Sequence, residues 1–556
     1  MKPKISTIEV AFIVAISLIT VFGLTKSVGG PMFSDELAYI TPGINGTENL
    51  GIMNRYFHVY IQAFFMQLAP TPITGVRLFW SSEMVLTALM IYFGIRLLNK
   101  KATAIHSLVG GIFFFSLNFF LIYAGVTLID FTSMILVTSI LFLYLLSLRF
   151  ERGTRWFVLG MGAILFFSYE TKEVNLVVGL VAIGFGLNGK GEFHWNLLWQ
   201  KLRWFILGIP CGIIVFMILS GVVVHDIFWA LRPSEYILYS HGYASLYLGE
   251  HQPYDYLRAL VDMLPLFMLF LIAGFKNGIG IGSREKIIWY FPFVLVIEIS
   301  MIWIYSPYGT LPRLLYSALP VMCMFVPQIL HYDFPAKRTQ RVHLIIAILI
   351  GLLLIAGMVM AFPYISRAIG WDYSDFAHSL LIDVIFSGVM ILLASIRKYG
   401  QYSFALALCG VVLLVAEPMR TNYIDVVVNR SNQKLYIDRI SPFSSFKSSI
   451  HYSPSMQMLV SSNLSHSYGI LAAQLDDLVG LFDLYFDEPA ERNNFKVVDD
   501  NSDLVTHILE NSFNYVLMSN EDWDYISQQS NEVFSIKALY KIRSDKSGRI
   551  YFLEKN

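Results

Sequence analysis

The feature that most constrains the fold of this chain is a series of long apolar runs, which fills most of its first 420 residues. A membrane-spanning helix needs roughly 20 mainly apolar residues, and about 13 runs meet that requirement. Charged residues make up only 14% of the chain, against about 25% in a typical soluble domain. The sequence therefore predicts a polytopic α-helical membrane protein. The runs are centred near Ile16, Ala88, Phe115, Ile140, Leu165, Val181, Val215, Met268, Leu295, Val321, Leu352, Met390 and Leu408.

Basic residues in the connections predict how these helices are oriented. One set of connections, together with the N-terminal flank, carries about 19 Lys and Arg, and the other set before residue 421 carries about 9. Because cytoplasmic loops are enriched in Lys and Arg, we expect the N-terminus in the cytoplasm. The opposite side then holds the connections at 25–75 and 223–261 and the short turns at Asp130 and Lys172.

The last part of the chain, residues 421–556, has a different composition. It carries 12 basic and 18 acidic residues, a net charge of −6, and short alternating runs such as "FNYVLMS" and "GRIYFLE" that are typical of strands. The stretch "SNLSHSYGILAAQLDDLVGLFDLYF" could hold a short helix. We therefore predict a transmembrane catalytic domain at 1–420 and a small extracytoplasmic α+β domain at 421–556.

Composition also excludes several classes of protein. The net charge of zero and the pI near 7.2 give no basic footprint for nucleic acid. The three cysteines all lie in apolar runs, so no disulfide framework or zinc spacing can be drawn. The stretch "GIGIGS" at 278–283 lacks the Lys-Ser/Thr ending of a phosphate-binding loop.

The stretch "MFSDELAYITPG" at 32–43 places two adjacent carboxylates, Asp35 and Glu36, just beyond the first apolar run. Ser34 could cap a short helix with these acids in its first turn, where the helix dipole favours negative charge. A cap can also carry chemistry. Since adjacent side chains do not face each other on a helix or a strand, only one of the two should be the reactive acid.

Other ionisable residues gather on the same predicted outer side. Ionisable groups buried at membrane depth are costly and usually functional. Asp130 could serve only as a helix cap, and Lys172 could pair with Glu170 or Glu173 or reach the interface. Arg55, His58 and Arg313 complete the set, with Arg313 open to a role as a helix anchor. A cluster of mixed charge predicts a site that handles an anion and a proton.

The order of these features resembles the GT-C superfamily of polyprenyl-phosphate-sugar-dependent glycosyltransferases, which includes protein O-mannosyltransferases and the lipid A aminoarabinose transferase. The resemblance covers residues 8 to 330 well and the later part only in layout. Its first-loop acidic motif is similar to "SDELAYI", and "NRYFHVYIQAFF" contains Arg55 but lacks the proline pair common in the family. The other matching stretches are "LIDFTSMILVTSILFLYLL", "RWFVLGMGAILFFSYETKEVNLVVGL" and "PRLLYSALPVMCMF".

The resemblance implies an inverting glycosyltransferase in the bacterial inner (cytoplasmic) membrane. It would move a sugar from a polyprenyl-phosphate donor to a hydroxyl of a glycan, lipid or protein acceptor on the extracytoplasmic face. Asp35 would be the general base, supported by Glu36, and Asp130 would position the acceptor or help to hold a metal. The candidate ligands of the lipid phosphate are Lys172, Arg313 and Arg55, with His58 as a further candidate.

The sequence does not establish a cofactor, although acids from two loops could converge on a divalent metal such as Mg²⁺ or Mn²⁺. Two other functions share the helices and the cations. One is a flippase or transporter of lipid-linked sugars, which would need no base outside the membrane. The other is a lipid-linked oligosaccharide ligase or polymerase, in which the key loop should come late in the helical region.

Overall fold

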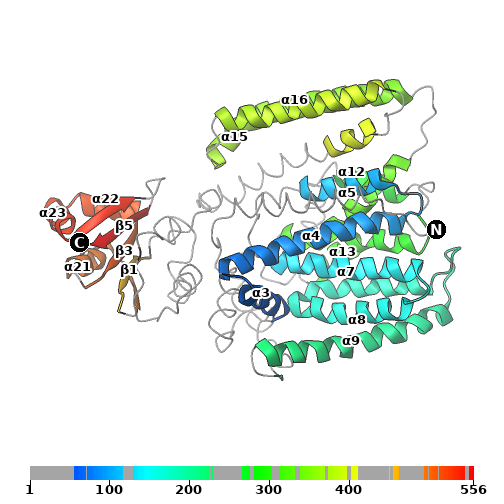
Figure 1. Cartoon of the computed structure of the whole chain (residues 1–556), viewed down its shortest axis with the longest axis horizontal. Helices are drawn as coiled ribbons and strands as arrows, with labels where there is room; N and C mark the ends of the chain where they lie inside the picture. Colours follow the sequence, from blue (N-terminus) through cyan, green and yellow to red (C-terminus); the bar gives the residue numbers. More distant parts are fainter. Residues whose placement is uncertain are drawn as a thin grey trace.

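The structure is a computed structural model of the whole chain, and it describes the larger part of it (Figure 1). The described residues are 56–70, 72–116, 129–223, 227–228, 266–275, 281–302, 312–331, 339–369, 373–396, 402–410, 450, 455–462, 494–498, 500, 501–510, 512–544 and 550–556. The helices of the membrane region are α3 (Tyr56–Leu68), α4 (Pro72–Leu98), α5 (Ala104–Ser116), α7 (Ile129–Arg149), α8 (Thr154–Thr171), α9 (Trp195–Val223), α12 (Leu266–Phe275), α13 (Phe291–Ile302), α14 (Leu319–Phe325), α15 (Thr339–Ile369) and α16 (Tyr373–Ser395). The described residues also include the 3₁₀ stretches η2 (Glu173–Gly186), η5 (Glu285–Tyr290), η6 (Pro312–Ala318) and η7 (Val326–His331).

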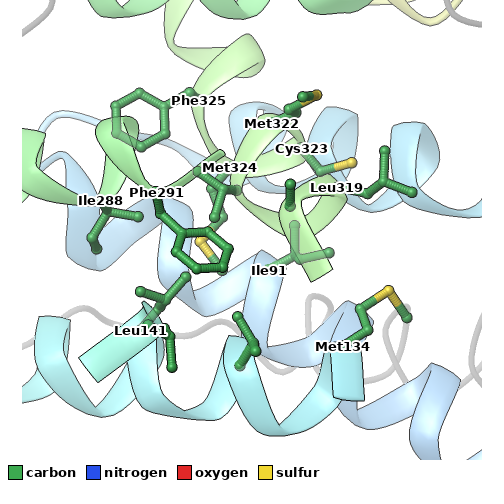
Figure 2. Close-up of a cluster of buried hydrophobic side chains, with 14 of the residues drawn as sticks. Ile91, Met134, Leu141, Ile288, Phe291, Leu319, Met322, Cys323, Met324 and Phe325 are labelled. Carbon is green, nitrogen blue, oxygen red and sulfur yellow. The ribbon is translucent and has the colours of Figure 1, made fainter. Parts of the chain in front are cut away.

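Helix α7 lies within the main bundle and contacts α4, α8, η2 and η6 (Figure 1). Its apolar residues are buried on nearly every side, as expected for a helix surrounded by other helices. Figure 2 shows Met134 and Leu141 of α7 beneath a layer formed by α14, with Ile91 of α4 between them. Every residue of α14 is buried, so this short helix fills the space between α4, α5 and α12.

Helices α8 and α9 approach each other closely because small residues line their contact. A Cβ atom on Gly162 would lie 2.0 Å from the backbone oxygen of Phe205, and one on Gly208 would lie 2.0 Å from that of Leu159. Gly212 follows Gly208 by four residues and meets the backbone of Ala163. Small residues at this spacing allow helices in a membrane to pack backbone to backbone.

The end of α7 at Arg149 is fixed by a polar network of its own. Arg149 donates from Nε to the backbone oxygen of Leu97 at 2.7 Å and from Nη2 to that of Leu98 at 3.2 Å. It also pairs with Glu285, with 2.9 Å between Nη2 and Oε1. A cation at these terminal carbonyls satisfies the end of α4 and ties it to α7 and η5.

Helices α15 and α16 form a separate pair beside the main bundle (Figure 1). They have a small core of their own with the segment 402–410, built from Ala347, Leu354, Met390 and Ala407. Many of their other apolar side chains are exposed, among them Leu352, at 61%. Helices with apolar surface on all sides are typical of membrane spans.

A five-stranded sheet lies in the C-terminal part of the chain (Figure 1). Its strand order is β2-β1-β3-β5-β4, in which β1 runs parallel to β2 and β3, and β5 runs antiparallel to β3 and β4. Helices α21, α22 and α23 bury Leu504, Ile508, Ile526 and Ile536 against it. The bounds are β1 (Met458–Ser461), β2 (Phe495–Val498), α21 (Asn501–Leu509), β3 (Tyr515–Ser519), α22 (Asn520–Ser527), α23 (Ser530–Leu539), β4 (Tyr540–Ser544) and β5 (Ile550–Lys555).

The structure confirms much of the secondary structure expected from the sequence. All predicted run centres except Ile16, which lies outside the described residues, fall in a helical or 3₁₀ segment. The strands expected in "FNYVLMS" and "GRIYFLE" are β3 and β5. The helix expected after Ser462 and the domain boundary at 420 lie outside the described residues, and the boundary stays a prediction.

Two features of the membrane region were not expected. Helix α3 stands in the stretch that was predicted to be only a long connection, and it packs on α4, α8 and α9. The run near Val181 is the 3₁₀ stretch η2. Among the described residues, four segments are long and apolar enough to cross a membrane: Thr74–Leu98, Ile129–Arg149, Trp195–Val222 and Arg341–Met360.

Candidate active site

An ion pair between Asp130 and Lys172 lies where α7 begins and α8 ends. The Nζ atom of Lys172 donates a hydrogen bond to Oδ1 of Asp130. The exposed fractions of the two side chains are only 7% for Lys172 and 1% for Asp130. The sequence left open whether Lys172 pairs with Glu170 or Glu173 or reaches the interface, and the structure pairs it with Asp130, an acid 42 positions away. Removing either partner of such a buried pair leaves an uncompensated charge.

A break between α8 and η2 positions Lys172. The backbone is extended at Lys172, with φ −162° and ψ 120°, so α8 ends there and the 3₁₀ stretch begins at Glu173. The backbone N–H of Lys172 still donates to the backbone oxygen of Ser168, at 2.8 Å. The chain thus turns out of the α-helix at Lys172, whose side chain reaches Asp130 on α7.

Asn175 holds this break on the next turn. Its Nδ2 donates to the backbone oxygen of Ser168 at 3.2 Å, and its Oδ1 accepts a 2.7 Å hydrogen bond from the hydroxyl of Ser133. Ser133 follows Asp130 by three residues and Asn175 follows Lys172 by three, so the two helical segments meet at matching positions. The Ser133–Asn175 contact therefore fixes the register in which Asp130 meets Lys172.

Two further helices, α3 and α4, join the site through Thr132 on α7. Its hydroxyl donates to Oε1 of Glu83 on α4, and its oxygen lies 2.6 Å from Nδ1 of His58 on α3. All three side chains are buried. The carboxylate of Asp130 interacts electrostatically with the imidazole of His58. The candidate residues Asp130, Lys172 and His58 therefore belong to one polar cluster.

The remaining predicted site residues are placed only in part. Arg313 lies in η6, a segment that packs against α7 and α13; the structure describes its backbone and not its side chain. Asp35, Glu36 and Arg55 lie outside the described residues. Their roles stay predictions.

Sequence reasoning missed four polar residues of this cluster: Glu83, Thr132, Ser133 and Asn175. Glu83 carried a usable signal, because a carboxyl group in the middle of "RLFWSSEMVLTALM" is costly in an apolar helix. The other three are uncharged and common in membrane helices. Only the spatial contacts identify them.

Within the described part of the chain, no group of three His, Cys, Asp or Glu side chains comes together as a set of metal ligands. Asp130, which was expected to position the acceptor or help to hold a metal, is engaged by Lys172. The possible metal site, which would need acids from a second loop as well, stays a prediction. The chemistry that the described residues offer is a cation held next to a carboxylate, with a buried acid and an imidazole nearby.

Comparison with known proteins identifies the fold. No protein-family profile and no curated protein sequence matches the chain, but solved structures do, over its full length. The chain shares its fold with ArnT, as the resemblance seen in the sequence implies.

The particular structure that carries this result is that of ArnT from Cupriavidus metallidurans bound to undecaprenyl phosphate. It is 14% identical to the chain, covers 99% of the chain and 98% of its own length, and gives a TM-score of 0.59. The apo structure of the same protein gives a TM-score of 0.58 at 14% identity, over 98% of the chain and 97% of its own length. The oligosaccharyltransferase AglB from Archaeoglobus fulgidus, in complex with an inhibitory peptide and a dolichol-phosphate, gives only 0.39 at 11% identity, over 99% and 75%.

Proposed function

We propose that the chain is a glycosyltransferase that moves a sugar from a polyprenyl-phosphate donor to an acceptor hydroxyl at the extracytoplasmic face of the bacterial inner membrane. The observation that carries this proposal is the buried Asp130–Lys172 pair in a fold that matches ArnT from end to end. That ArnT structure contains undecaprenyl phosphate, which supports a lipid phosphate as the donor class.

The proposed reaction is a single displacement that inverts the anomeric carbon. The acceptor oxygen attacks this carbon and loses its proton to a general base, while the bond to the phosphate oxygen breaks and its electron pair leaves with the phosphate. Asp35 is our candidate for the base, with Glu36 in support. A base of this kind contributes about 10²- to 10⁴-fold to the rate.

Lys172 is our candidate for steadying the departing phosphate, together with Arg313 and, as a weaker third, Arg55. In the structure Lys172 is held by Asp130, so the phosphate must compete with that carboxylate or share the ammonium group with it. Asp130 in this scheme compensates the charge of Lys172 until the phosphate takes its place. Preorganised cations of this kind stabilise the charge that develops in the transition state.

Two variants test the phosphate site. Lys172→Met should weaken donor-phosphate binding by roughly 10- to 150-fold, the equivalent of one lost charge-assisted contact. Asp130→Asn should bind the phosphate at least as well as wild type, because it removes the competing carboxylate. If Lys172→Met binds a polyprenyl phosphate as tightly as wild type, the phosphate site is misplaced.

Transfer by the purified protein separates this proposal from its alternatives. A flippase or transporter of lipid-linked sugars would release no sugar from a defined donor, whereas a transferase would. A ligase or polymerase would require a lipid-linked oligosaccharide and would not use a monosaccharide donor. Mass spectrometry of envelope glycans with and without the protein would name the sugar and the acceptor.

A further inference from the structure

Three buried polar side chains from three helices form a continuous hydrogen-bonded chain beside the Asp130–Lys172 pair. His58 on α3, Glu83 on α4 and Thr132 on α7 are 0%, 4% and 2% exposed. Thr132 stands in the middle, next to both Nδ1 of His58 and Oε1 of Glu83. The proposed phosphate and base chemistry does not use Glu83 or Thr132.

The threonine hydroxyl limits where the protons of this hydrogen-bonded chain can lie, because it has one hydrogen and two acceptor lone pairs. When Thr132 donates to Glu83, it must accept from His58, and the imidazole then carries its hydrogen on Nδ1. When Glu83 is protonated and donates to Thr132, the hydroxyl donates to Nδ1 of His58. The imidazole then carries its hydrogen on Nε2. The two arrangements differ by one proton and by the tautomer of His58.

We propose that His58, Thr132 and Glu83 form a proton relay that takes up the proton released during sugar transfer. A proton bound at Nε2 of His58 displaces the hydrogen on Nδ1 to the oxygen of Thr132, whose own hydrogen passes to Oε1 of Glu83. No covalent bond other than those to the moving protons is made or broken. The final state holds a neutral imidazole and a neutral carboxylic acid, and return of the proton reverses the steps.

The location of this hydrogen-bonded chain suits a role in proton transfer. Thr132 lies two residues after Asp130 at the start of α7, and the carboxylate of Asp130 interacts electrostatically with the imidazole of His58. The acceptor hydroxyl must lose a proton in each transfer, and the general base must pass it on before the next turnover. This part of the inference rests on the proposed function, whereas the relay itself can be measured without sugar transfer.

Helices α8 and α9 also pack against α3. From α8, Phe167 stacks on Phe57 with ring centroids 4.7 Å apart. From α9, Ser220 donates to the hydroxyl of Tyr60 at 3.3 Å. Glu83 on α4 is connected to His58 through Thr132. The carboxylate of Asp130 on α7 interacts electrostatically with the imidazole and also pairs with Lys172.

The relay predicts fast exchange of the acid proton of Glu83, which infrared spectroscopy of the full-length protein in detergent can follow at a pH low enough to protonate this carboxyl group. The carboxylic-acid band of Glu83 is the one that Glu83→Gln removes. After transfer into D₂O, this band should shift quickly in wild type and in Thr132→Ser, which keeps the hydroxyl. In Thr132→Val, which has nearly the same shape without a hydroxyl, the shift should slow by about tenfold, the factor that corresponds to one hydrogen bond.

His58→Phe gives a second interruption and should slow the shift as Thr132→Val does. Equal exchange rates in wild type, Thr132→Val and His58→Phe would overturn the relay and leave the three residues as a contact between helices. The absence, at every pH at which the protein stays folded, of an acid band that Glu83→Gln removes would also overturn it. These measurements decide the relay even if the protein transfers no sugar, which would defeat only the proposed function.

In the transfer reaction, the relay predicts a lower kcat for Thr132→Val, an unchanged KM for the lipid donor, and recovery in Thr132→Ser. The solvent deuterium isotope effect on kcat should also differ between the valine and serine variants. A loss of thermal stability in Thr132→Val with an unchanged kcat would contradict a role in proton transfer.

Discussion

Removing either partner of the Asp130–Lys172 pair should destabilise the protein strongly, because both side chains are almost fully buried. Lys172→Met leaves the Asp130 carboxylate without its cation, and the loss of one partner of a buried pair costs about 3–5 kcal/mol. Asp130→Asn leaves the ammonium group of Lys172 in the same position and should cost a similar amount. The double variant leaves no buried charge, so it should be more stable than the sum of the single changes predicts.

A double-mutant cycle measures this coupling as the difference between the double variant and the sum of the two single variants. We expect a coupling free energy of about 2–3 kcal/mol, at the upper end of values for residues in contact. The assay is denaturant unfolding in detergent micelles, followed by circular dichroism. The same samples should keep native helix content in the absence of denaturant, which shows that the variants still fold.

The surface pair Arg543–Glu554 provides a matched control. Its atoms Nη2 and Oε2 lie 3.1 Å apart, and the side chains are 36% and 24% exposed. An exposed pair of this kind contributes about 0–1 kcal/mol, so the cycle of Arg543→Met and Glu554→Gln should give a small coupling. Additive effects at Asp130 and Lys172, as small as those of the control pair, would refute the view that the buried pair is a strong interaction.

Three further predictions concern other parts of the chain. Gly208→Leu should separate α8 from α9 and lower the melting temperature, because even a Cβ atom at this position would lie 2.0 Å from a backbone oxygen. Gly111→Leu should change the melting temperature little, because a Cβ atom there would meet nothing within 4 Å. Hydrogen bonds from Ser502 hold the pKa of Asp500 below its usual value, so this cap of α21 should stabilise the helix above that usual value. As the pH falls through the lowered pKa the effect should be lost, and amide hydrogen exchange in α21 should then approach that of Asp500→Ala. A C-terminal reporter that is active only in the cytoplasm should stay silent, because the basic loops predict that residues 421–556 lie outside. A strong signal would show that the predicted helix count is wrong by one.

The sequence predicted the elements well because their signals are local. Apolar runs of spanning length identify helices regardless of what surrounds them, and the alternating pattern of "FNYVLMS" identifies β3 in the same way. Helix α3 was missed because its 13 residues are too few for a spanning helix. The 3₁₀ geometry of η2 could not be foreseen, since its composition is that of an ordinary apolar helix.

The candidate site was predictable only where it contains charge. Asp130 and Lys172 stood out because each is an ionisable group between apolar runs, but their pairing depends on the break at Lys172 and on the Ser133–Asn175 contact. These are long-range contacts between neutral residues, and a single sequence gives no sign of them. Glu83 could have been found by the same criterion as Asp130.

The most direct test of the proposed function is sugar transfer by the purified protein from a defined polyprenyl-phosphate sugar, compared between wild type and Asp35→Asn. Asn keeps the size of Asp and much of its ability to cap a helix, but it cannot take a proton near neutral pH. We predict transfer by wild type and a fall of about 10²- to 10⁴-fold in Asp35→Asn, with donor binding and thermal stability little changed and a smaller loss in Glu36→Gln. Transfer by Asp35→Asn at nearly the wild-type rate, or greater damage from Glu36→Gln, would contradict the assignment of the base, and a wild-type protein that releases no sugar from any such donor would contradict the proposed function.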